Sequence, residues 1–307
     1  MKIRLGYACI STTLDITTSG TITYTNFLKE KNYNKINNLI TSNLTNLKEL
    51  LIYNIKNNIH FFRISSNLIP LATKDDVCFD YIKSYKKKYD ELSEIINDNN
   101  IRVDFHLPEF CVLNSTSKET VANSIQIIEY HYNLLKAMNI KNKVLVLHIG
   151  SSVLGKKNSI ARFINNFNKL PDYLKKIIVI ENDDKVFNIE DCLDINKKTN
   201  IPIVLDYHHY ICNPSNLNFE DIFSTWKITP KVHFSSPKSK IKKEFRSHND
   251  YINSDDFITF LDKIKNLNYD IDIMIEAKKK DEALFKLVRE LKYKTNYKFI
   301  DETTFEI

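Results

Sequence analysis

The stretch "IPIVLDYHHYIC", residues 201–212, runs apolar for five residues and then presents Asp206, Tyr207, His208 and His209 in succession. A strand that is apolar throughout is typical of a parallel sheet buried on both faces. A carboxylate and two imidazoles at the exit of such a strand could bind a metal, transfer a proton or cap the strand end. This stretch is therefore informative about both the fold and the chemistry of the protein.

Seven further segments read in the same way, so the sequence predicts eight strands, at residues 2–9, 60–66, 102–108, 143–150, 176–183, 201–208, 231–236 and 270–277. Between them lie segments with helical spacing of apolar residues, and a last such segment, around Leu284 to Leu291, is expected to close the chain. Strict alternation of strands and helices implies parallel strands joined by crossovers. Eight such units predict an α/β fold, a single-domain (β/α)8 TIM barrel over residues 1–307. A doubly wound open sheet would show a glycine-rich loop after its first strand, and "GYACIS" is not one.

Composition limits the class of protein. With 43% apolar and 27% charged residues among 307, the chain resembles an ordinary soluble globular protein. It contains no apolar run long enough for a membrane span, and its start lacks the pattern of a signal peptide. Its five cysteines show no CxxC spacing, which argues against disulfides and thiolate metal sites. We expect a soluble intracellular monomer, whose net charge of +6 permits an anionic partner.

Metal-capable side chains fall at or just beyond the carboxyl ends of the predicted strands. They are His106, His148, Glu181, Asp206, His208, His209, His233, His248 and Glu276. Each alone could be a core histidine or a helix-capping acid, as we infer for His60 and His131. Together they would meet at one rim of a barrel, where active sites are built. Nitrogen and oxygen ligands in this number predict a cluster of two or three divalent ions such as zinc, manganese or iron.

A lysine-rich loop follows the seventh strand and carries Lys238, Lys240, Lys242, Lys243 and Arg246. Such a run is usually a solvated loop, but beside a phosphodiester site it would clamp a nucleic-acid backbone. Tyr7, at the rim end of the first strand, could be a core aromatic or could stack on a base.

The sequence resembles the UV damage endonucleases, barrel enzymes related to endonuclease IV. The matching pieces are "LGYAC", "FRISSNLIPLA", "FHLPEFCVLNS", "LVLHIGS", "IVIENDD", "VLDYHHYICNP", "KVHFSSPK", "SHNDYI" and "MIEAKKKDEALFKL". They follow one another in family order and span nearly the whole chain.

This resemblance implies a metal cluster held by His106, His148, Glu181, Asp206, His209, His233, His248 and Glu276. Manganese is the usual ion in the family, with zinc or magnesium as alternatives. Catalytic roles are implied for Lys231, Glu181 and Glu276, with Lys231 matching a lysine that the family carries in carboxylated form. The implied reaction is hydrolysis of the phosphodiester immediately 5′ to a photolesion in double-stranded DNA, which initiates excision repair.

Two departures from the family pattern stand out. A Gln-Tyr pair that probes the duplex in the family is replaced here by Glu109 and Phe110, which we assign to DNA contact. Where the family tends to carry a histidine after "SSxLxP", this chain has Thr73 and Lys74. The lesion preference and the metal count therefore do not carry over directly.

Three alternatives remain open at this stage. An endonuclease IV-like enzyme would share the metals and act on abasic sites, whereas a xylose isomerase-like enzyme would share the barrel but not need the lysine-rich loop. A damage-binding protein with a decayed site is the non-catalytic alternative. One conflict also stands: strand alternation places His208 on the side of Asp206, while the resemblance selects His209.

Overall fold

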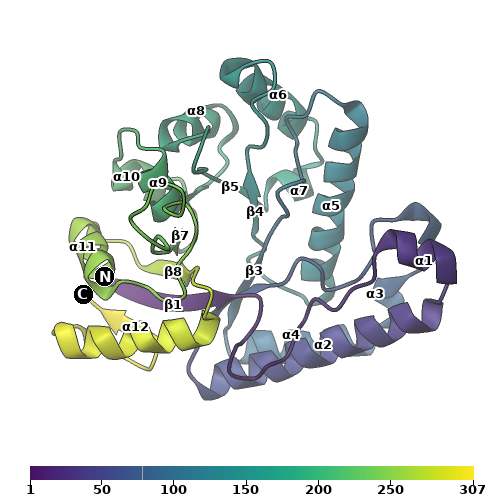
Figure 1. The fold of residues 1–307 in the computed structure, drawn as a ribbon, viewed down its shortest axis with the longest axis horizontal. Coiled ribbons are helices and arrows are strands. Elements are labelled where there is room, and N and C mark those ends of the chain that lie inside the picture. Colours follow the sequence, from purple (N-terminus) through teal and green to yellow (C-terminus); the bar gives the residue numbers. More distant parts are fainter. Residues whose placement is uncertain (78) are drawn as a thin grey trace.

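The computed structural model describes residues 1–77 and 79–307 as a closed barrel of eight parallel strands ringed by helices (Figure 1). Neighbouring strands pair in chain order, and β1 closes the barrel by pairing with both β8 and β2. The barrel strands are β1 Lys2–Ala8, β2 Phe61–Ile64, β3 Arg102–His106, β4 Leu145–His148, β5 Ile178–Glu181, β6 Ile203–Asp206, β7 Lys231–Phe234 and β8 Ile271–Ile275. The predicted TIM barrel and all eight predicted strands are confirmed.

Helices cover the outside of the barrel and fill the loops. They are α1 Tyr24–Glu30, α2 Tyr33–Lys56, α3 Tyr81–Ser84, α4 Lys86–Asp98, α5 Lys118–Ala137, α6 Lys156–Asn168, α7 Asp172–Lys175, α8 Ile189–Thr199, α9 Tyr207–Cys212, α10 Phe219–Phe223, α11 Ser254–Ile264 and α12 Lys280–Lys294, with a 3-10 turn at Asp75–Val77. Their starts follow local chemistry: in α8, Asn188 and Asp191 form a reciprocal capping box. None of the described helices is long and apolar enough to cross a membrane.

The strands present two different faces. Outward residues such as Leu5, Leu147 and Ile273 join the main apolar core against the helices. Inward residues form smaller apolar groups, one of which contains Val146, Val179 and Trp226. Gly6 lets β1 approach β2, because a Cβ there would lie 2.2 Å from the carbonyl oxygen of Phe61. Each strand is therefore buried on both sides, as the uninterrupted apolar runs indicate.

Charged residues also fill the barrel interior. Arg4 and Arg102 both bind Asp272 near the amino ends of the strands. One layer higher, the Lys231 ammonium donates to Asp104 over 2.6 Å, with both side chains fully buried. The barrel interior thus contains layers of paired acidic and basic side chains below the carboxyl ends of the strands.

The chain ends in a hairpin that the sequence reading did not predict. After α12, strands β9 Lys298–Phe299 and β10 Thr304–Glu306 form, and β10 pairs antiparallel with the first half of β1. The prediction that a helix closes the chain is wrong. A two-residue strand carries too little periodicity to be recognised against its neighbours.

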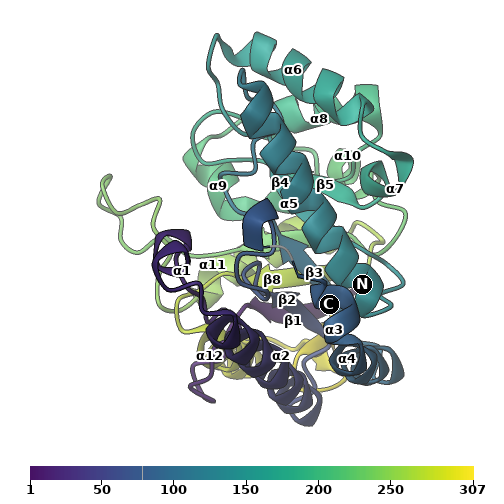
Figure 2. The same ribbon diagram turned by 90° about the vertical axis from the view of Figure 1, so that its right-hand side faces the viewer.

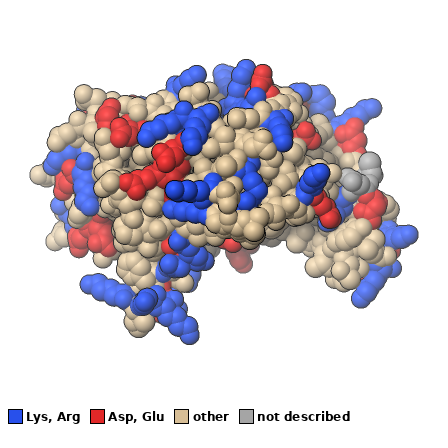
Figure 3. All heavy atoms as spheres, turned by 90° about the horizontal axis from the view of Figure 1, so that it is seen from above, with Lys and Arg blue, Asp and Glu red and all other residues tan. Residues whose placement is uncertain are grey.

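The two ends of the barrel differ in shape. We call the carboxyl ends of β1–β8 and the loops that follow them the rim. The rim lies at the left of Figure 2, where the green loop after β7 projects furthest, and both termini lie on the opposite side. Seen from above, the rim side at the bottom of Figure 3 is hollowed between a basic projection and the lobe that carries α1.

Candidate metal centre

The predicted ligands gather at the rim. His106, His148, Glu181 and Asp206 are the last residues of β3, β4, β5 and β6, while His233 lies within β7 and Glu276 follows β8. His209 lies in α9 and His248 in the loop between β7 and α11. We call these eight residues the rim cluster.

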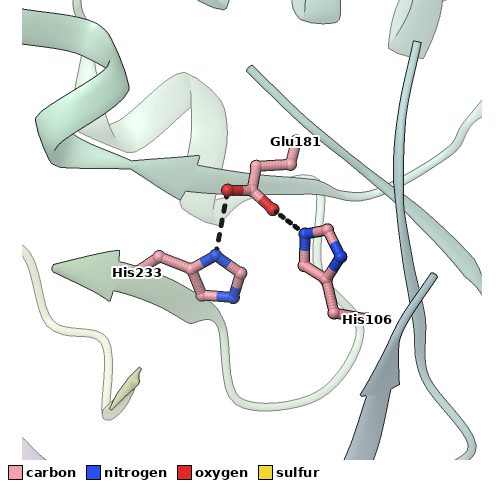
Figure 4. A group of neighbouring side chains, drawn as sticks. All are labelled: His106, Glu181 and His233. Atoms are coloured by element: carbon pink, nitrogen blue, oxygen red, sulfur yellow. Dashed lines mark hydrogen bonds and ion pairs between the residues drawn. The ribbon is translucent and has the colours of Figure 1, made fainter. Parts of the chain in front are cut away.

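Glu181 is at the centre of the cluster. Its two carboxylate oxygens lie 2.9 Å from His106 Nε2 and 3.0 Å from His233 Nδ1 (Figure 4). Burial alone would raise the pKa of this carboxyl, but His233, His148 and His106 hold its pKa well below the usual range. The carboxylate is therefore ionised although it is almost completely buried.

The contact between Glu181 and His106 is unfavourable without a positive charge beside it. The Nδ1 of His106 donates to the Leu107 carbonyl over 2.8 Å, so a neutral ring turns the lone pair of Nε2 toward the carboxylate. Two acceptors 2.9 Å apart repel each other unless the ring is protonated or an ion lies between them.

Asp206 is a buried carboxylate whose charge is only partly compensated. One oxygen accepts from the His209 amide over 2.7 Å, but the other is buried with no hydrogen-bond partner. Burial raises the pKa of Asp206 to about 8, against the opposing effect of His209. Binding of a cation would stabilise a buried carboxylate oxygen that has no hydrogen-bond partner.

The chain geometry favours His209 over its neighbour His208 as a ligand. The strand ends at Asp206, which caps α9, so the period changes and His209 turns back toward Asp206 and Glu181, at 3.6 and 3.5 Å. The expectation from strand alternation that His208 would share the side of Asp206 is wrong. His208 instead lies against Phe245 and His248, with its Nε2 3.8 Å from Cys212.

Asn182 sets the orientation of His209. It exchanges hydrogen bonds with the backbone of Asp206, and its carbonyl accepts from Nδ1 of His209 over 3.0 Å. Nε2 is then the ring nitrogen with a free lone pair, while Nδ1 is the nitrogen that lies 3.5 Å from Glu181 and 3.6 Å from Asp206. The sequence reading did not single out Asn182, although it directly follows Glu181 in "IVIENDD".

Glu276 is held by a residue that the sequence reading also missed. The Arg63 guanidinium, from β2, donates to Glu276 and to Nε2 of His233. Burial favours the neutral acid, but Arg63 and His233 keep the pKa of Glu276 well below its usual range. His248 is more loosely placed, 3.9 Å from Glu276. An arginine inside a buried strand, as in "FFRI", was the available signal.

His148 completes the cluster at its edge. Its ring centre lies 5.0 Å from that of His106 and 5.9 Å from that of His209. Its Nδ1 is buried without a partner, and burial lowers its pKa, which favours the neutral ring that a metal ligand requires.

The donor set fits divalent ions. Three overlapping groups each place their ligand atoms within 4.8 Å of one another. They are His106, Glu181 and His233; Glu181, Asp206 and His209; and Asp206, His233 and Glu276. Imidazole nitrogens and carboxylate oxygens without thiolates suit zinc, manganese or iron, and the sharing of residues between groups suits neighbouring ions.

Lys231 lies below the cluster rather than within it. It shares a face of β7 with His233, but its ammonium is paired with Asp104 and lies 5.5 Å from the centre of the Phe61 ring. Burial lowers its pKa to about 8, even though Asp104 opposes that change. In its unmodified form Lys231 neutralises Asp104.

The predicted DNA-contacting residues divide into three sets. Glu109 and Phe110 are exposed in the loop after β3, and Phe110 is 68% exposed. The lysine-rich loop lies on the rim, where Lys238 pairs with Glu244 and Arg246 with Asp184. Lys240, Lys242 and Lys243 are exposed.

Tyr7 forms the third set alone, and of its two expected roles the structure shows the core aromatic and contradicts base stacking. Its ring is fully buried, packs edge-on against Phe62, and its hydroxyl donates to Asn54 of α2. Tyr7 points outward from β1 into the helix layer, so no face of the ring is free to stack on a base. Thr73 and Lys74, at the position of the absent histidine, lie after β2, and the Lys74 ammonium lies over the Tyr24 ring.

Comparisons with known proteins agree with this geometry. A family model described as UV-endonuclease UvdE matches residues 3–305. The UV DNA damage endonuclease of Bacillus mycoides is 38% identical, and the match covers both chains completely. The crystal structure of SacUVDE superposes with a TM-score of 0.86 at 34% identity, covering 95% of this chain and 98% of the other.

A more distant likeness concerns the fold alone. Endonuclease IV from Thermus thermophilus superposes with a TM-score of 0.57 at 11% identity, covering 94% of this chain and 99% of that one. The family model and the close relatives both span nearly the full length of the sequence. This chain belongs to the UV-endonuclease UvdE family.

Proposed function

We propose that this protein is a UV DNA damage endonuclease that hydrolyses the phosphodiester immediately 5′ to a photolesion in double-stranded DNA and depends on divalent metal ions, with Mn²⁺ preferred. The observation that carries the proposal is the rim cluster, whose unpaired Asp206 oxygen and opposed acceptors at Glu181 and His106 call for cations. Family membership over residues 3–305 supplies the substrate class.

The chain's own residues would hold and orient the ions. Glu181, Asp206 and Glu276 would supply carboxylate ligands, and His106, His148, His209, His233 and His248 would supply imidazole nitrogens. Bound ions would lower the pKa of a water molecule and neutralise charge that develops on the phosphate. Asn182 fixes the ring of His209, so this ligand is oriented before substrate arrives, and Arg63 holds the carboxylate of Glu276.

The surroundings of the cluster favour a duplex as substrate. The rim is hollowed, and one wall of the hollow carries a concentration of basic side chains (Figure 3). Lys240, Lys242 and Lys243 would contact phosphates, which fixes the register of the duplex without reading its sequence. Exposed Phe110 would insert at the lesion, where pairing is already weakened and unstacking costs less.

Incubation of the purified protein with Mn²⁺ and a duplex that contains one defined photoproduct tests the proposal. We expect a single nick 5′ to the lesion that leaves a 3′-hydroxyl, so a polymerase should extend the product directly. Glu181→Gln, which removes the charge shared by three histidines, should abolish nicking. A folded, metal-loaded wild-type protein that leaves the photoproduct duplex intact would contradict the proposal.

The same assay decides the alternative of an abasic-site endonuclease, because both activities would use the same metals. A duplex with one abasic site serves as the second substrate. Faster cleavage of that duplex than of the photoproduct duplex would favour the endonuclease IV-like activity.

A further inference from the structure

The loop between β7 and α11 projects beyond the other rim loops and presents an apolar side chain. We call residues 237–248 the basic loop; it is the green segment at the far left of Figure 2. Ile241 is 65% exposed and stands between Lys240 and Lys242. A single exposed aliphatic side chain is common on protein surfaces, so the surroundings of Ile241 decide whether it has a role.

The basic loop is pre-organised. Its ends form an antiparallel bridge between Pro237 and His248, and the Lys238 amide donates to the Ser247 carbonyl. Inside the loop, Glu244 accepts from Lys238 and from the Ser239 hydroxyl. The amides of Glu244 and Phe245 both donate to the Ile241 carbonyl over 2.9 Å. Ile241 is therefore held at a fixed place on a closed turn.

The charge around Ile241 favours an anionic partner. Within the described part of the chain, Lys240, Lys242 and Lys243 make no ion pair, whereas Lys238 is neutralised by Glu244. Three unpaired lysines surround the exposed isoleucine. Contacts with phosphates would draw such a tip onto a duplex and offset the cost of inserting an apolar group.

Ile241 and Phe110 lie on loops that follow two different strands of the barrel. β3 and β7 lie four strands apart in a closed ring of eight, so their loops rise from opposite sides of the rim. His106 of β3 and His233 of β7 both contact Glu181 (Figure 4). The loops that carry Phe110 and Ile241 therefore begin on opposite sides of the ring of strands around this carboxylate.

We propose that Ile241 is a second apolar wedge, which inserts between base pairs of the bound duplex on the side of the site opposite Phe110. This inference rests on the proposed function and adds a positioning residue to it. Apolar side chains that enter a base step unstack and kink the duplex. Two wedges on either side of the cluster would hold a kinked duplex with the scissile phosphate between them.

The test uses Ile241→Ala, with Ile300→Ala as the matched control. Ile300 is 54% exposed after β9 in the C-terminal hairpin, away from the rim. 2-Aminopurine is placed in turn at three positions on each side of a photoproduct, since its fluorescence rises when its base is unstacked. We expect wild type and Ile300→Ala to raise the fluorescence at two separate positions, and Ile241→Ala to lose one of them.

Binding and nicking give a second readout. Ile241→Ala should weaken binding to the photoproduct duplex by about tenfold without changing the dependence on salt, because no phosphate contact is lost. Removing Lys240, Lys242 and Lys243 together should instead flatten the salt dependence. Ile241→Leu, which keeps an apolar tip, should restore the fluorescence signal.

The outcomes separate the two proposals. If wild type fails to nick but still raises the fluorescence at the Ile241-dependent position, the proposed endonuclease activity fails and the wedge stands. If wild type nicks and Ile241→Ala matches it in fluorescence and binding, the wedge is overturned and the activity stands.

Discussion

At the scale of single residues, the end of β6 determines where the side chain of His209 lies. Because β6 stops at Asp206 and α9 begins at once, the side chain three residues on returns to the cluster. We expect His209→Ala to lose more bound metal than His208→Ala, measured by elemental analysis after dialysis. Circular dichroism of both variants controls for folding. Greater metal loss from His208→Ala would contradict this assignment.

His131 offers a test of buried charge far from the rim cluster. It lies in α5, where Nδ1 donates to the Ile127 carbonyl and Nε2 is buried without a partner. Burial lowers its pKa from 6.5 to about 4, so the folded protein keeps the ring neutral where the unfolded chain would protonate it. The stability that this supplies is complete above pH 6.5 and is lost as the pH falls from 6.5 toward 4.

His131→Phe keeps the edge-on contacts with Phe105 and Tyr130 but cannot titrate. Between about pH 7.5 and 4.5, urea unfolding of metal-free protein should show a smaller loss of stability for the variant than for wild type. The difference should be at most about 3 kcal/mol. Parallel pH profiles for the two proteins would rule out His131 as a contributor.

At the scale of elements, the loops after β3 and β4 are joined at Gly150. Asn114 exchanges two hydrogen bonds with Ser151, and Gly150, at φ +108°, leaves the space for this contact. A Cβ at Gly150 would lie 2.7 Å from Asn114 and 2.8 Å from Val112. The loop that carries Phe110 is thus braced against its neighbour.

Gly150→Ala should destabilise the fold and slow nicking, and Gly155→Ala is the matched control. Gly155 also has a positive φ, +91°, but a Cβ there would meet nothing within 4 Å. Both variants introduce backbone strain, and only Gly150→Ala should add about 1–3 kcal/mol of overpacking, measured by urea unfolding. Equal losses in the two variants would show that strain alone accounts for the effect.

At the scale of the whole molecule, the charged barrel interior makes stability depend on pairs. Asp104→Asn would leave the Lys231 ammonium buried without its counter-charge, which should cost about 3–5 kcal/mol of unfolding free energy. The double variant Asp104→Asn with Lys231→Met should recover much of this loss. Thermal and urea unfolding would check both, and strictly additive effects would show that the pair is not coupled.

The barrel could be predicted because its strands read as largely apolar runs that alternate with segments of helical spacing, whereas the C-terminal hairpin could not. The candidate metal ligands could be predicted because the parallel strands of a barrel bring their carboxyl ends together at one rim. The sequence did not reveal the roles of Arg63, Asn182 and Asp104. These roles depend on which strands face each other across the interior. The sequence left the role of Tyr7 open between core and base stacking, because one residue's register decides between the rim and the helix layer.

The hairpin β9–β10 has a consequence for how this chain can be rearranged. It brings the last residue beside the first: the Ile307 amide donates to the Met1 carbonyl over 3.0 Å, on the side away from the rim. A short peptide joining these ends would give a cyclic polypeptide whose new termini can be opened elsewhere on the ring of strands. A surface or a fused domain attached beside Met1 and Ile307 would leave the rim uncovered.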